Sequence, residues 1–163
     1  MPLIKNGKPA QDEYLFAGDD EPLSEGPVIV SLTRLRRERE ALLARNAPLG
    51  VKLAADQSPE ALGSDLKHLS LVALEFPTFR DGRPFSWARL LHTRLRFKGE
   101  IRATGDFLPD QIAFLVRTGF DALEFAGTPE VFTRALAEIS NVYQPSADGR
   151  KTIAQLRALK NQV

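Results

Sequence analysis

Residues 69–91 read "LSLVALEFPTFRDGRPFSWARLL", and this stretch contains an apolar run, a charged loop and the start of an amphipathic segment. The run that ends at Phe76 is short and mostly apolar, which predicts a buried strand. Ser86 can cap a helix, and the pattern that follows predicts a helix over residues 86–95. The stretch therefore predicts one strand, one loop and one helix, in that order.

The same order recurs along the rest of the chain. Short apolar or β-branched runs predict strands over residues 27–32, 49–56, 99–105 and 120–125. Capping residues and apolar stripes predict helices over residues 33–45, 109–118 and 128–139, and one that begins at Ser58. Five alternating strand–helix units predict an α/β fold with a parallel sheet and right-handed crossovers. Two architectures fit this alternation: a half (β/α) barrel-like sheet and an open doubly wound sheet.

Changes in composition divide the chain into three parts. Residues 1–26 are rich in proline, glycine and acids, and we expect an N-terminal extension with a hairpin at Asn6-Gly7, a pair that suits a tight turn. Residues 27–142 form the single α/β domain. Residues 143–163 form a tail with one short basic helix.

The bulk composition excludes several classes of protein. The 163 residues are 43% hydrophobic, and 22 basic residues nearly balance 21 acidic ones, which argues against a nucleic-acid binder. The chain has no cysteine, which excludes thiolate-held iron–sulfur clusters and thiol nucleophiles. It also shows no phosphate-loop or dinucleotide fingerprint and no histidine spacing typical of zinc, so we expect no cofactor and no metal. The absence of a long apolar run and of a signal pattern predicts a cytoplasmic protein without a membrane contact.

The charged loop lies where α/β folds bind ligands, beyond the carboxyl ends of the strands. Arginine forks and a free helix N-terminus both favour anions, so the loop predicts an anion site. The candidate residues for this site are Arg80, Arg83, Ser86 and Arg89. The alternative is a surface loop that pairs its own charges, with Asp81 orienting an arginine.

Other charged residues lie at or near the ends of the neighbouring strands. Arg102, inside the strand of residues 99–105, is a further anion-binding candidate, and its structural alternative is an ion pair with Glu75. Asp81, Asp106 and Glu124 are candidates for general acid or base catalysis. Asp106 can instead cap the helix that follows it.

Several segments, in their order and spacing, resemble one known family. They are "MPLIKNGKPAQDEY", "FPTFRDGRPFSWARLL", "FKGEIRATGDFLPDQIAFLVRTGFDALEF" and "VYQ", within residues 1–144. Together they resemble a proteobacterial family of unknown function that is encoded beside assimilatory sulfite reductase and is labelled as oxidoreductases of sulfite reduction. The resemblance implies a role in sulfur assimilation.

Two functional hypotheses follow. Because the chain has no cysteine to hold an electron-transfer cluster, the first is an accessory protein of sulfite reduction that binds a small oxyanion, the sulfite reductase or another sulfur-assimilation enzyme. The second is a small enzyme that acts on an anionic substrate by acid–base chemistry. Because a half barrel exposes sheet edges, we also expect self-association into a homo-oligomer.

Overall fold

The computed structural model describes residues 2–161 and contains one sheet of eight strands. The ends of the predicted extension and tail, residues 1 and 162–163, lie outside the described residues. The strands are β1 (Leu3–Lys5), β2 (Lys8–Ala10), β3 (Leu15–Phe16), β4 (Val28–Ser31), β5 (Leu49–Leu53), β6 (Leu71–Phe76), β7 (Glu100–Gly105) and β8 (Ala122–Glu124). Their spatial order is β2-β1-β8-β7-β6-β5-β4-β3.

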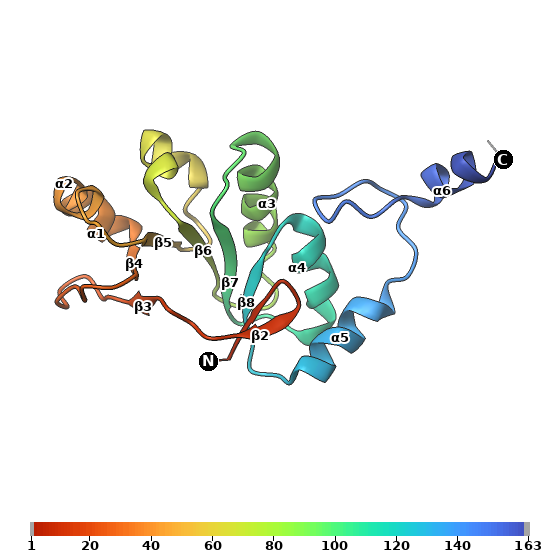
Figure 1. The fold of residues 1–163 in the computed structure, drawn as a ribbon, viewed down its shortest axis with the longest axis horizontal. Coiled ribbons are helices and arrows are strands. Elements are labelled where there is room, and N and C mark those ends of the chain that lie inside the picture. The colour runs from red at the N-terminus through yellow and green to blue at the C-terminus, as the bar shows by residue number, and fades with distance from the viewer. Residues whose placement is uncertain (1, 162–163) are drawn as a thin grey trace.

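The strand order identifies the architecture as a curled half barrel. From β3 to β8 the strands are parallel and follow one another in chain order, without the reversal that defines a doubly wound sheet. Right-handed crossovers in a sheet of this order place the helices on one face. In Figure 1, α1 to α4 lie on the upper side of the strands. The five predicted strands are all present.

The prediction of a purely parallel sheet with five strands is wrong, because the N-terminal segment supplies three more. β1 pairs antiparallel with both β2 and β8. Asn6 and Gly7 have positive φ angles of 49° and 79°, as a tight hairpin turn requires, so the predicted hairpin forms there. The segment thus extends the sheet at both edges.

Most of the helices lie in the connections between the strands, and the last two follow β8. The helices are α1 (Leu32–Arg37), α2 (Arg39–Leu43), η1 (Pro59–His68), α3 (Arg83–Arg89), η2 (Leu90–Arg94), η3 (Pro109–Gln111), α4 (Ile112–Thr118), α5 (Pro129–Glu138) and α6 (Ile153–Lys160). The helix predicted over residues 33–45 is divided at Glu38, and it begins at Leu32 with Ser31 as its N-cap. Between residues 2 and 161 no helix is both long and apolar enough to cross a bilayer.

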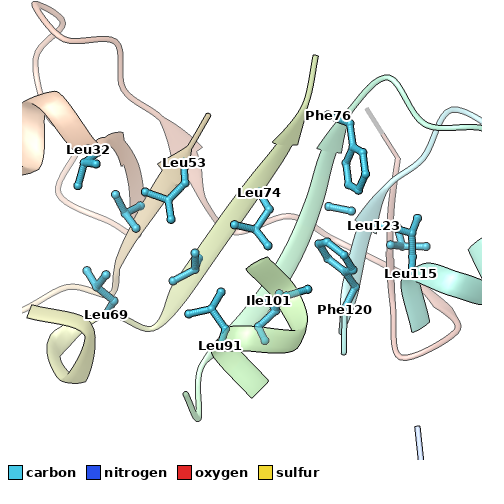
Figure 2. Packing of buried hydrophobic residues seen from close by; sticks show 14 of the residues in the cluster. Leu32, Leu53, Leu69, Leu74, Phe76, Leu91, Ile101, Leu115, Phe120 and Leu123 are labelled. Atoms are coloured by element: carbon cyan, nitrogen blue, oxygen red, sulfur yellow. The ribbon is translucent and has the colours of Figure 1, made fainter. Parts of the chain in front are cut away.

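Side-chain alternation along the strands separates the two faces of the sheet. In β6, Val72, Leu74 and Phe76 face the helices and are at most 1% exposed. Figure 2 shows Leu74 and Phe76 in the layer between the strands and the helices. The Phe76 ring meets the Phe85 ring edge to face, with centroids 5.1 Å apart. Each such buried side chain contributes about 2 kcal/mol to folding.

Among residues 2–161, no helix covers the opposite face of the sheet, and residues 11–16 cross it. These residues, here called the strap, connect β2 at one edge of the sheet with β3 at the other. Figure 1 shows this segment, in red and orange, running below the strands. The Tyr14 ring packs on Leu71 and Ala73, and its hydroxyl donates to Ser70 Oγ at 3.0 Å. We call the covered side of the sheet the strap face.

Candidate functional site

The predicted site residues divide between two places in the fold. Most of them lie in or beside the β6–α3 loop (residues 77–82), at the carboxyl ends of β6 and β7. Arg102 and Glu124 lie on the strap face. No hydrogen bond or ion pair within residues 2–161 joins the predicted residues of one group to those of the other.

At the end of the loop, Asp81 forms an ion pair with Arg83, the first residue of α3. Arg83 Nε lies 3.0 Å from Asp81 Oδ1, and Arg83 Nη2 lies 2.6 Å from Asp81 Oδ2. This charge-assisted hydrogen bond from the Arg83 side chain, with a second from its backbone N–H, lowers the pKa of Asp81 below its usual 3.8. The loop therefore pairs these two charges internally, as the alternative interpretation expected.

The other three residues of the predicted anion site, Arg80, Ser86 and Arg89, do not form the N-cap of a helix. α3 begins at Arg83, with Gly82 as its N-cap and Pro84 in the first turn, so the prediction that Ser86 caps the helix is wrong. Ser86 and Arg89 are exposed residues of α3. Arg80 is exposed and stacks over the Phe79 ring, with its guanidinium 5.4 Å from the ring centroid.

Asp106 supports the loop and does not cap a helix. It follows Gly105, and its backbone N–H donates to the Phe76 carbonyl oxygen at 2.8 Å. Its Oδ2 accepts a hydrogen bond from the Phe79 N–H at 3.3 Å. The helix predicted over residues 109–118 begins at Pro109 as expected, as η3, but its N-cap is Leu108. Asp106 thus connects the end of β7 to the loop after β6.

Near Gln111 lie three exposed apolar residues that were not among the predicted site residues. The Gln111 side chain donates to the Phe79 carbonyl oxygen at 2.8 Å and accepts from the Leu108 N–H at 3.0 Å. Phe79, Leu108 and Phe114 are 38%, 38% and 54% exposed. Together with Gln111 they are here called the Gln111 patch. The patch borders a hollow of about 330 Å³ lined by Phe85, Asp110, Gln111, Phe114 and Thr118.

On the strap face, Arg102 is the centre of an ion-pair cluster. Its side chain is 1% exposed; Nε donates to Glu100 Oε1 and Nη1 donates to Asp12 Oδ2, both at 2.8 Å. Glu124 Oε1 lies 3.5 Å from the same Nη1. A buried guanidinium requires such partners, because an unpaired buried charge is costly.

The predicted ion pair between Arg102 and Glu75 is wrong for a reason of register. Arg102 lies opposite Ala73, whereas Glu75 lies opposite Thr104. Glu75 pairs instead with Lys52, whose Nζ is 2.6 Å from Oε1. Thr104 is 7% exposed, and within the described chain its Oγ1 has no hydrogen-bond partner.

The described residues do not include a group of three or more His, Cys, Asp or Glu side chains arranged to hold a metal ion.

Comparison with known proteins gives one match. The model of a family described as "Bacterial protein of unknown function (DUF934)" matches residues 50–154. No curated protein and no solved structure matches the chain. The matched range contains β6, the β6–α3 loop, β7 and the Gln111 patch, whereas the strap lies before it. The chain therefore belongs to the bacterial DUF934 family of proteins of unknown function.

Proposed function

We propose that this chain is an accessory protein of assimilatory sulfite reduction that binds the sulfite reductase through the Gln111 patch. One observation carries the binding mode: Gln111 binds the backbone of Phe79 and of Leu108 and lines a hollow with Phe114, and these three apolar residues are exposed. The assignment to sulfite reduction comes from the family resemblance of the sequence.

The composition of the patch favours a protein partner. Single exposed apolar residues are common, but here Gln111 links three of them: it binds the backbone of Phe79 and Leu108 and lines one hollow with Phe114. Arg80, stacked on Phe79, adds an exposed guanidinium at its border. Aromatic residues and arginine are enriched where protein interfaces concentrate their binding energy.

The pairing of the arginines favours a protein partner over a small oxyanion. Arg83 is held by Asp81, and Arg102 is held by Glu100 and Asp12. An oxyanion would have to displace a carboxylate from either guanidinium. A partner that covers Phe79 and Phe114 needs no such exchange.

The test is a binding measurement between this protein and purified sulfite reductase. We expect Phe79→Ala combined with Phe114→Ala to weaken binding about tenfold or more, since truncated interface anchors cost about 2 kcal/mol. Tyr143→Ala is the matched control, because Tyr143 is 79% exposed and lies outside the patch. Equal binding by the double variant and the wild type would contradict the proposed surface.

A genetic experiment tests the pathway independently of the surface. We expect a deletion strain to lose growth on sulfate and to recover it on sulfide, because the proposed defect lies between these two compounds. Growth on sulfate without the protein would contradict the role in sulfite reduction.

A small acid–base enzyme acting on an anionic substrate is the second candidate. Its supporting observation is that Glu124, partly exposed, lies 3.5 Å from the guanidinium of Arg102. A carboxylate beside an arginine can transfer a proton to an anion held by that arginine. This candidate predicts that Glu124→Gln fails to complement the deletion strain while it binds the reductase normally. Full complementation by Glu124→Gln would exclude it.

A further inference from the structure

We infer that the strap face contains a binding site for a small aromatic monocarboxylate, and that Asp12 and Tyr14 of the strap occupy this site in the closed state seen here. The inference does not depend on the Gln111 patch or on sulfite reduction.

Arg102 defines the position for the carboxylate of the ligand. Its guanidinium is held in place by Glu100, which belongs to the same strand and is itself 7% exposed in its side chain. Asp12 completes the contacts from outside the sheet, and its side chain remains 31% exposed. The sheet therefore orients the guanidinium, and the strap supplies the carboxylate that it binds.

The apolar residues under Tyr14 define the position for the aromatic ring of the ligand. Ile29, Leu71 and Ala73 form a small apolar cluster on the strap face, separate from the main core, and the Tyr14 ring packs against it. The ring also lies 5.6 Å from the Arg102 guanidinium, within the range of a cation–π contact. At the far end, Ser70 Oγ accepts the phenol hydroxyl at 3.0 Å.

The strap is attached in a way that allows another ligand to displace it. Within residues 2–161, the backbone of residues 11–14 forms no hydrogen bond with the backbone of the sheet, and the Tyr14 N–H is satisfied locally by Asp12 Oδ1. Ladder contacts begin only at Leu15, whose N–H donates to the Pro27 carbonyl oxygen. Side chains thus hold residues 11–14, and a ligand carrying the same groups competes with them directly.

The charges of the face favour a ligand with a single negative charge. The ion pairs on the face join three cations to four carboxylates, one of which is Asp12. When Asp12 leaves, a monocarboxylate restores the same balance. A dianion adds a further negative charge beside Glu100 and Glu124.

The experiment measures binding of 3-(4-hydroxyphenyl)propionate by calorimetry to the full chain and to an Asp12→Ala, Tyr14→Ala variant. The closed strap reduces the apparent affinity by the fraction of open molecules, so we expect the variant to bind about tenfold more tightly. The neutral amide of the same compound is the matched ligand control and should bind at least about tenfold more weakly than the acid, because it cannot form the charged contact with Arg102.

Three results would overturn the inference: no gain in the variant, equal binding of the acid and the amide, or binding that survives Arg102→Met. Hydrogen exchange of residues 11–16 in the wild type gives an answer even if the variants do not fold. The acid should increase exchange of Tyr14, and unchanged exchange at saturating acid would reject the competition. Phe79→Ala should bind the acid like the wild type, which separates this site from the Gln111 patch.

Discussion

Gly105 at the end of β7 lies against the Phe76 carbonyl oxygen at the end of β6. A Cβ built on Gly105 would be 2.3 Å from that oxygen, and Gly105 has a positive φ of 91°. The next residue, Asp106, donates its N–H to the same oxygen. This contact fixes the relative position of the two strand ends from which the β6–α3 loop and the Gln111 patch project.

We expect Gly105→Ala to destabilise the protein by about 2 kcal/mol or more. A side chain is unfavourable in the left-handed backbone conformation, and the new Cβ would clash with the Phe76 carbonyl oxygen. Gly82→Ala is the matched control: its φ is −85°, and its Cβ would meet no atom within 4 Å. The control should be neutral or slightly stabilising. Urea unfolding of both variants is the measurement, and equal stabilities would contradict the steric argument.

The pair Arg83–Asp81 predicts a shift in a carboxyl titration. Without the Arg83 side chain, the pKa of Asp81 should rise towards 3.8, though only partly, because the backbone N–H of residue 83 still donates to Oδ1. Since the folded-state pKa is lowered, the stabilisation by this pair is present above the unfolded pKa and is lost as pH falls through the folded pKa. Carboxyl NMR of Arg83→Ala measures the shift, and Arg80→Ala should leave Asp81 unchanged.

The pair Arg83–Asp81 also predicts how sulfite changes the melting temperature of variants in the loop. Asp81 competes for Arg83, so sulfite should raise the melting temperature of Asp81→Ala more than that of the wild type. At tenfold the dissociation constant the expected increase is about 3–6 °C. Arg83→Ala should abolish this increase, and Asp110→Ala, which removes an acid of η3, is the control. A larger shift in Arg83→Ala than in Asp81→Ala would exclude Arg83 as the anion ligand.

Arg102 predicts a large stability change on the strap face. Arg102→Met leaves Glu100 and Asp12 without this guanidinium, and removing one partner of a buried pair costs about 3 kcal/mol. Arg94→Met is the control, because Arg94 pairs with Glu60 at the surface, where such pairs contribute at most about 1 kcal/mol. Denaturant unfolding compares the two, and similar losses would show that Arg102 behaves as a surface arginine.

The alternation of strands and helices could be predicted because each element carries its own local signal. The run that ends at Phe76 is apolar except for Glu75, and Gly119 ends α4 in the left-handed conformation, with a φ of 108°. The order of the strands in space has no such local signal. In particular, nothing local shows that β1 and β2 lie beside β8, because that position depends on the pairing of β1 with β8, which are far apart in the chain.

The site was less predictable, because its contacts depend on register and on distant segments. The sequence shows that Arg102 lies inside a strand, but it does not show that Arg102 lies opposite Ala73 on the neighbouring strand. Asp12 and Tyr14 stand in an acidic, proline-rich stretch that resembles a loop. Phe79, Leu108 and Phe114 did carry a signal: each is a large apolar residue at a loop or helix position where a polar one is usual.

The hairpin at Asn6-Gly7 has a consequence for biosynthesis. Of the eight strands of this sheet, β1 is made first, yet its neighbour β8 is made last. Closing a loop that contains nearly the whole domain is slow compared with forming each strand–helix unit. We therefore expect nascent chains to assemble β4 to β8 in order of synthesis, and the N-terminal residues to dock only once translation has passed Glu124.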